Sequence, residues 1–141
     1  MKYKDGYKYQ LLDKLISYKL PIQTGQELFC DDFLQITKGG VLFIKKGYAW
    51  DGCSGPTWDD KTNMRAGLIH DALYQFMRNN LLPRDTWKPI ADQVLYDIMC
   101  EDAEALGKIM WIYKPRAWYY KLAVEKFGYN ATTTPKKVYT A

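Results

Sequence analysis

Histidine is the scarcest titratable residue in this chain of 141 residues, with His70 as its single copy. Metal-dependent phosphohydrolases of the His-Asp type use several histidines, so one histidine argues against that class. The three cysteines, Cys30, Cys53 and Cys100, are odd in number, far apart and without a Cys-x-x-Cys pair. A disulfide scaffold and a Cys3His zinc site are therefore both disfavoured, and we expect small buried thiols in a reducing compartment.

Long apolar runs are absent as well. No stretch approaches the roughly 20 residues of a transmembrane helix, and residues 1–6 lack the apolar centre of a signal peptide. We therefore expect neither a membrane span nor an export signal. A length of 141 residues with 48% hydrophobic and 26% charged residues is typical of one globular domain. Aromatic residues make up 16%, which favours an aromatic core or a docking surface.

The net charge of +4 is unevenly distributed. Residues 85–104 carry six acidic side chains, whereas the chain from Gly107 onward carries seven basic residues against the single acid Glu125. Such a basic, aromatic C-terminal region fits an anionic partner, either a lipid surface or nucleic acid. A solvated helix face fits it equally well.

The first 46 residues predict a small antiparallel sheet. Residues 7–12 and 15–20 are strand-like, and residues 33–37 and 41–44 flank Lys38-Gly39-Gly40, which is typical of a hairpin turn. Residues 47–60 contain glycines and a proline and predict a loop. The fold class expected for the single domain 1–141 is therefore α+β, with a β-rich part over 1–46 and a helical part over 61–128.

Three helices are expected in the second part. The first begins near Lys61, is capped by Asp59 or Asp60, and ends at Asn79-Asn80. The second begins near Pro89 and ends near Leu106, and the third covers 109–127 with a bend or break at Pro115. Residues 129–141 predict a loose tail. The apolar stripes of the first two helices are the expected core: Met64, Leu68, Ala72, Leu73, Phe76, Met77, Ile90, Val94, Leu95, Ile98 and Met99.

The string His70-Asp71-Ala72-Leu73-Tyr74 is the best candidate for chemistry. On a helix, His70 and Tyr74 share one face at i,i+4. Antiparallel packing of the next helix would bring Asp92 to that face, where it would fix the imidazole tautomer and leave a general base for water. Asp71 points to another sector and could hold a calcium ion with the loop residues Gly52, Ser54 and Gly55, because calcium accepts backbone carbonyl ligands.

These residues resemble the phospholipase A2 family, especially its compact viral capsid form, over roughly residues 50–100. The resemblance implies a phospholipase A2-like helix pair with His70 as base, Asp71 as calcium ligand, Tyr74 as hydrogen-bond support and Asp92 as partner of His70. The implied substrate is the sn-2 ester of a glycerophospholipid. The N-terminal sheet takes the place of that family's N-terminal helix, and Trp50-Asp51-Gly52-Cys53-Ser54-Gly55 is not its usual calcium-loop string.

Over its whole length the chain resembles a family of phage and prophage proteins classed as a domain of unknown function. The resemblance is carried by Asp51-Gly52-Cys53-Ser54-Gly55-Pro56, then His70-Asp71-Ala72-Leu73-Tyr74, then Ala91-Asp92, after N-terminal strands. It implies a phage origin without supplying a reaction. With that origin we expect a location in the host cytoplasm or the virion, and the two resemblances together lead us to expect a phospholipid surface or a phage or host protein as partner.

Other interpretations of the same residues remain open. Ser54 or Cys53 could act as a nucleophile with His70 and Asp92, although Gly52-Cys53-Ser54-Gly55 is not a Gly-x-Ser-x-Gly elbow. Alternatively, the polar groups form a buried network in a non-catalytic phage assembly or host-interaction protein.

A candidate membrane or partner surface lies in residues 110–121, with Trp111, Arg116, Trp118, Tyr119 and Lys121 as its expected contacts. Tryptophan and tyrosine mixed with basic residues suit a lipid interface. The alternative is an ordinary amphipathic helix that closes the core. Nucleic acid is disfavoured as a partner because no recognition motif is present.

Overall fold

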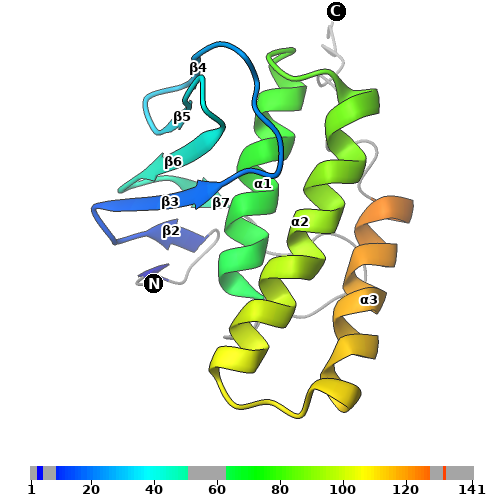
Figure 1. Ribbon diagram of the computed structural model, residues 1–141. Coiled ribbons are helices and arrows are strands. Elements are labelled where there is room, and N and C mark those ends of the chain that lie inside the picture. The colour runs from blue at the N-terminus through cyan, green and yellow to red at the C-terminus, as the bar shows by residue number, and fades with distance from the viewer. Residues whose placement is uncertain (1–2, 5–8, 51–62, 128–131, 133–141) are drawn as a thin grey trace, which may run out of the picture.

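The computed structural model describes residues 3–4, 9–50, 63–127 and 132. Short antiparallel strands come first in the chain and three helices follow, so the expected α+β class is confirmed. In Figure 1 the strands lie on one side of α1, while α2 and α3 follow on its other side. Helix α1 is therefore the central element of the molecule.

The strands form two antiparallel sheets. One has the order β1-β2-β7, with β1 at Tyr3–Lys4, β2 at Tyr9–Leu11 and β7 at Ala49–Trp50. The other has the order β3-β6-β5-β4, with β3 at Leu15–Lys19, β4 at Leu28–Cys30, β5 at Leu34–Ile36 and β6 at Val41–Lys45. The strands expected at 15–20, 33–37 and 41–44 are confirmed within one or two residues.

The expected hairpin joins β5 to β6. Its turn depends on Gly40, whose φ of +88° suits glycine and few other residues. The Thr37 hydroxyl accepts a hydrogen bond from the backbone N–H of Val41 at 3.1 Å. Ile36 pairs with Leu42 and Leu34 with Ile44, so the buried side chains of both strands face the core together.

Helix α1 covers Met64–Arg78, and 11 of its 15 residues are buried because the helix is enclosed by strands on one side and α2 on the other. All the expected core residues of this helix are buried. The expected N-cap was wrong. The cap position is Asn63, whereas Asp59 and Asp60 lie outside the described residues. The helix ends where predicted, at Asn79 and Asn80.

Helix α2 covers Arg84–Ala105, so it begins five residues before Pro89, the start that we expected. Pro89 lies inside the helix, close enough to its first turn that the missing N–H removes one hydrogen bond without stopping the helix. Asp92 is consequently not in the first turn, where Asp85 stands instead. Val94, Leu95, Ile98 and Met99 are buried as expected, and Ile90 is half-buried.

Helix α3 covers Met110–Phe127 without a break, although Pro115 lies within it. The interruption expected at Pro115 was therefore wrong. Thr132, the one described residue after α3, is buried, and its carbonyl accepts a hydrogen bond from Arg84 Nε at 3.4 Å. At this position the expectation of a loose tail was wrong as well.

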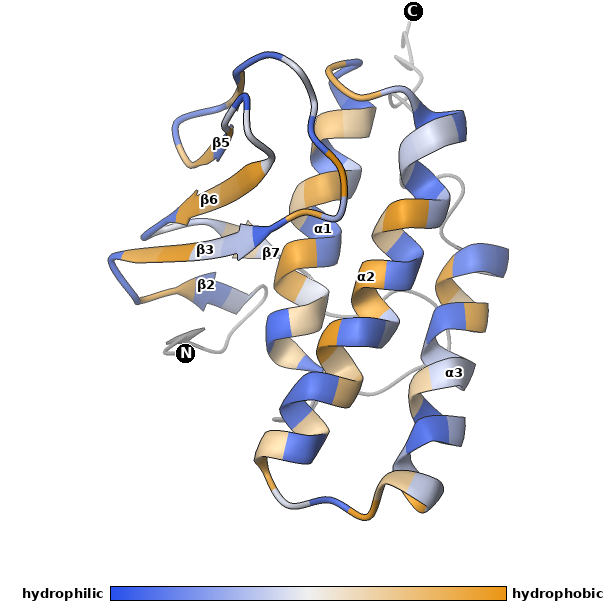
Figure 2. Cartoon of the chain, in the orientation of Figure 1, coloured by the Kyte–Doolittle hydropathy of each residue, from blue (hydrophilic) through white to orange (hydrophobic). Residues whose placement is uncertain are grey.

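One hydrophobic cluster includes residues from the strands and from all three helices. Figure 2 shows apolar residues where α1 faces the strands and α2. Leu11, Ile44 and Trp50 from the strands belong to the same cluster as Leu73 from α1 and Leu95 from α2. Cys30 and Cys100 both carry free thiols, the first buried and the second half-buried.

Candidate functional site

Two facing helices supply the polar groups of the site. His70 and Tyr74 stand one turn apart on α1, and Lys88 and Asp92 stand one turn apart on α2. The helices are consecutive and run in opposite directions (Figure 1), so one turn of α1 faces one turn of α2. This arrangement brings together His70, Tyr74 and Asp92, the three residues predicted as catalytic.

Asp92 is the centre of the network. Its Oδ1 lies 2.8 Å from His70 Nε2 and accepts a hydrogen bond of 2.5 Å from the Tyr74 hydroxyl. Its Oδ2 lies 2.8 Å from Lys88 Nζ. The His70 and Tyr74 rings are also in contact, with centroids 4.0 Å apart and their planes tilted by 45°. We call these four residues the Asp92 network.

Lys88 was missed by the sequence prediction. Besides its ion pair with Asp92, its ammonium donates to the backbone carbonyls of Val124 at 3.3 Å and Glu125 at 3.2 Å. Those carbonyls belong to the last turn of α3, where helical carbonyls lack intrahelical partners. Lys88 thus links the Asp92 network to α3. The i,i+4 spacing of Lys88 and Asp92 is the sequence signal that could have identified this pair.

Burial sets the charges of the network. His70, Asp92 and Tyr74 are each 1% exposed. Burial opposes the ionisation of Asp92, but the hydrogen bonds that the carboxylate accepts from His70, Lys88 and Tyr74 outweigh it and lower the carboxyl pKa. Burial also lowers the pKa of His70 below 6.5, against the effect of Asp92. At neutral pH the network therefore contains a carboxylate, an ammonium and a neutral imidazole.

These protonation states fix the tautomer of His70. An ionised carboxylate only accepts hydrogen bonds, so Nε2 of the neutral imidazole carries the proton and donates it to Asp92. The lone pair of the ring is then on Nδ1, which is the basic atom of the site. Burial and the charge of Asp92 raise the pKa of Tyr74, so its hydroxyl stays protonated as a donor. The arrangement can therefore accept one proton at Nδ1 and stabilise the resulting imidazolium.

The predicted calcium ligands are only partly within the described residues. Asp71 is half-buried on α1, and its charge contributes to the raised pKa values of Tyr48 and Tyr74. Gly52, Ser54 and Gly55 of the expected calcium loop lie outside the described residues, as does Cys53. Within the described ranges, no group of three or more His, Cys, Asp or Glu side chains is arranged to hold a metal.

The predicted membrane or partner residues all lie on α3. Trp111, Trp118 and Tyr119 are exposed, whereas Arg116 and Lys121 are half-buried. Arg116 donates to the Tyr120 hydroxyl at 3.3 Å and lies over the rings of Tyr113 and Tyr120. In the described part of the chain, no helix is long and apolar enough to cross a membrane.

Comparison with known proteins yields no relative: no family model matches the chain, and neither a curated protein nor a solved structure is significantly similar to it.

Proposed function

We propose that the protein is a phage-associated ester hydrolase of the phospholipase A2 type. The observation that carries this proposal is the contact of 2.8 Å between His70 Nε2 and Asp92 Oδ1, reinforced by the Tyr74 hydroxyl on the same oxygen. An imidazole that is neutral, oriented and backed by a carboxylate is the general base that water activation requires. The sn-2 ester of a glycerophospholipid is the proposed substrate.

In the proposed reaction His70 Nδ1 removes a proton from water while the water oxygen bonds to the ester carbonyl carbon. The carbonyl π electrons move to oxygen, and the imidazolium is stabilised by Asp92. When the tetrahedral intermediate collapses, the ester C–O bond breaks and His70 returns its proton to the leaving alkoxide. Lys88 and Tyr74 hold Asp92 in place throughout. A calcium ion on Asp71 and the loop would stabilise the oxyanion.

Fatty acid release from phospholipid vesicles in calcium-containing buffer tests this function. Wild type should release fatty acid and lysophospholipid, and His70→Gln should lose at least about a hundredfold in rate because the general base is gone. Tyr48→Phe is the matched control, since Tyr48 is a buried tyrosine whose hydroxyl bonds Gln75 rather than Asp92. Equal rates for wild type and His70→Gln would rule out the proposed base.

A chelator and Asp71→Asn test the calcium part separately. Both should abolish release, because the oxyanion would lose the cation that stabilises it. Activity that survives a chelator would remove calcium from the mechanism but leave His70 as base.

A second candidate is a non-catalytic phage structural or host-interaction protein. The exposure of only 1% for both His70 and Asp92 favours it, because a buried, satisfied network ties helices together without meeting a substrate. In that case His70→Gln and Asp92→Asn would each destabilise the fold by about 2–4 kcal/mol. Neither protein, nor the wild type, would then release fatty acid.

A further inference from the structure

Large apolar side chains occupy the side of α3 that faces solvent. Trp111 is 79% exposed and Trp118 is 54% exposed. The inward side of the helix carries the buried residues Tyr113, Ala117, Tyr120 and Val124. We use the name apolar outer face for the exposed large residues of α3 and of the turn before it: Leu106, Ile109, Trp111, Ile112, Trp118, Tyr119 and Leu122.

Helical spacing makes this face continuous. Trp111, Trp118 and Leu122 follow one another at intervals of seven and four residues, so they lie along one line of the helix. Ile112 and Tyr119 form the neighbouring line. The stripe from residue 111 to residue 122 extends for about 16 Å at 1.5 Å per residue. A surface helix usually turns polar residues outward, and a contiguous exposed apolar patch typically marks a contact site.

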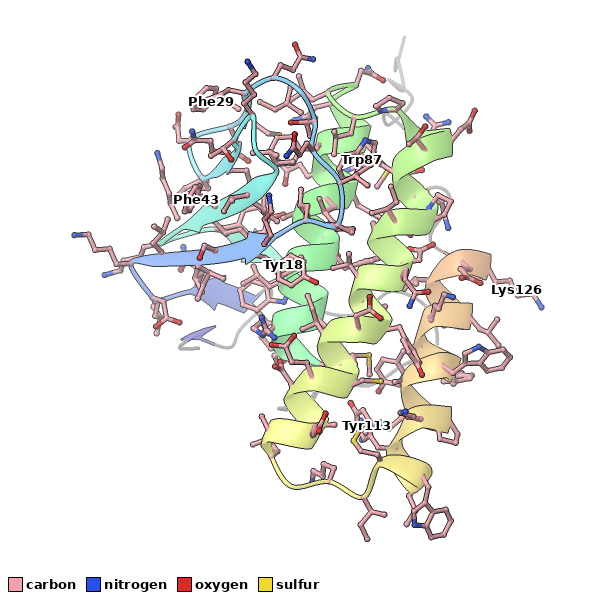
Figure 3. All side chains as sticks on the ribbon, viewed as in Figure 1. Tyr18, Phe29, Phe43, Trp87, Tyr113 and Lys126 are labelled. Atoms are coloured by element: carbon pink, nitrogen blue, oxygen red, sulfur yellow. The ribbon has the colours of Figure 1, made fainter. Side chains whose placement is uncertain are left out.

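Basic residues border the apolar outer face. Helical geometry places Lys114 and Lys121 along one edge of the stripe and Arg116 along the other. Figure 3 shows Lys126 pointing away from the bundle at the C-terminal end of α3. Between residues 106 and 127 the sequence contains five basic residues and one acid, Glu125, which pairs with Lys121 at 3.5 Å. The surroundings of the patch are therefore positive.

The turn before α3 also contains a shallow hollow of about 370 Å³. Its lining combines the apolar side chains of Ile109 and Ile112 with the basic residues Lys108 and Arg116, and Tyr113 lies beside them. Apolar walls next to two cations suit a molecule that is itself part hydrocarbon and part anion. A phospholipid has this combination.

We propose that the apolar outer face docks the protein onto the surface of an anionic phospholipid bilayer. Tryptophan and tyrosine rings prefer the headgroup depth, leucine and isoleucine reach the acyl boundary, and the bordering lysines and arginine attract anionic headgroups. Four aliphatic residues in the face favour lipid over nucleic acid, because aliphatic side chains offer no plane on which a base can stack. This docking mode rests on the proposed function of a phospholipid hydrolase. Vesicle binding can nevertheless be measured without any turnover.

Sedimentation with vesicles tests the docking. Wild type should sediment with phosphatidylcholine vesicles that contain phosphatidylglycerol, and much less with pure phosphatidylcholine. Trp111→Ser/Trp118→Ser should bind at least about tenfold more weakly, since both rings leave the interface. The matched control is Phe29→Ser, because Phe29 is 61% exposed but lies on the strand side of the molecule, away from α3 (Figure 3). This control should bind as wild type does.

Charge variants and a catalytic-site variant complete the test. Lys114→Gln/Lys121→Gln should weaken binding by about fivefold per charge at low salt, and the difference should shrink as salt is added. His70→Gln should bind vesicles like wild type even if it loses turnover, so failure of the hydrolase function is distinguishable from failure of docking. The double tryptophan variant should melt near the wild-type temperature, because Trp111 and Trp118 are exposed.

Two results would overturn the docking proposal. One is a wild-type protein that stays in the supernatant with anionic vesicles, and the other is a double tryptophan variant that binds them undiminished. Binding of a single-stranded oligonucleotide or an acidic peptide that depends on Trp111 and Trp118, without vesicle binding, would assign the face to that partner instead.

Discussion

Lys88 and Asp92 stand one turn apart on α2 and are joined by an ion pair of 2.8 Å. Asp92 is 1% exposed, and the Lys88 side chain is 13% exposed. Lys88 therefore supplies the positive charge that balances a buried carboxylate, while His70 stays neutral. Since the same ammonium also binds carbonyls at the end of α3, one side chain both balances the charge of the site and adds polar contacts to the packed α3 helix.

Lys88→Met should be strongly destabilising. Methionine keeps the length of the side chain but leaves the buried Asp92 carboxylate without its cation, which should cost about 2–4 kcal/mol in the free energy of unfolding. Urea denaturation measures this cost. Lys121→Met is the matched control, because its partner Glu125 is exposed and the pair is worth about 0.5 kcal/mol or less. Similar losses in the two variants would show that Lys88 does not balance a buried charge.

The pH dependence of stability should report the lowered pKa of His70. Below about pH 6.5 the unfolded chain binds a proton at His70 that the native protein does not bind, so the free energy of unfolding falls as pH decreases. The slope is at most about 1.4 kcal/mol per pH unit. Asp92 acts at lower pH: its stabilisation is present above the ordinary carboxyl pKa and is lost as pH falls through its lowered native value.

Because His70 is the single histidine of the chain, its effect can be isolated. Urea denaturation between about pH 5 and pH 7.5 should show the slope in wild type and a nearly flat profile in His70→Gln. The imidazole C–H signal in the NMR spectrum should titrate below pH 6.5. A titration above 6.5 would mean that Asp92, rather than burial, dominates the pKa of His70.

Local patterns in the sequence predict part of the fold and part of the candidate site. The apolar stripe of α1 identified its core residues, and the i,i+4 spacing of His70 and Tyr74 placed both on one face. Antiparallel packing of consecutive helices then sufficed to bring Asp92 to them. Lys88 was missed because the sequence does not show that the Asp92 carboxylate is buried and therefore needs a balancing cation.

The errors of prediction have different physical causes. Strands β4 and β7 have only three and two residues, and such short strands exist through pairing with distant strands, which local patterns do not show. The start of α2 was placed at Pro89 because proline is common in the first turn. The helix instead begins at Arg84 and tolerates Pro89 at its sixth position. Pro115 is likewise tolerated near the start of α3.

Tyr74→Phe tests what the Tyr74 hydroxyl contributes to the stability of the Asp92 network and to its hydrolytic rate. Loss of the hydroxyl removes a hydrogen bond to the Asp92 carboxylate and should cost about 1.5–3 kcal/mol. It should also raise the pKa of Asp92 and reduce any hydrolytic rate. Tyr48→Phe should destabilise less, by about 0.5–1.5 kcal/mol, because Gln75 is neutral and the network is untouched. If Tyr48→Phe lowered the rate as much as Tyr74→Phe, the Asp92 network would not be responsible for the activity.

Arg65 anchors the start of α1 to the end of α2, and Arg65→Lys should weaken that anchor. The guanidinium Nε lies 3.1 Å and 3.2 Å from the two Asp102 oxygens, and Nη2 lies 2.9 Å from both Asp102 and Glu101. A lysine ammonium cannot reproduce this fork, but about a quarter of the side chain is exposed, so the loss should be only about 0.5–1 kcal/mol. A double-mutant cycle with Asp102→Asn measures the pair directly. Coupling should shrink in high salt, and strictly additive effects of the two substitutions would show that the contact contributes nothing to stability.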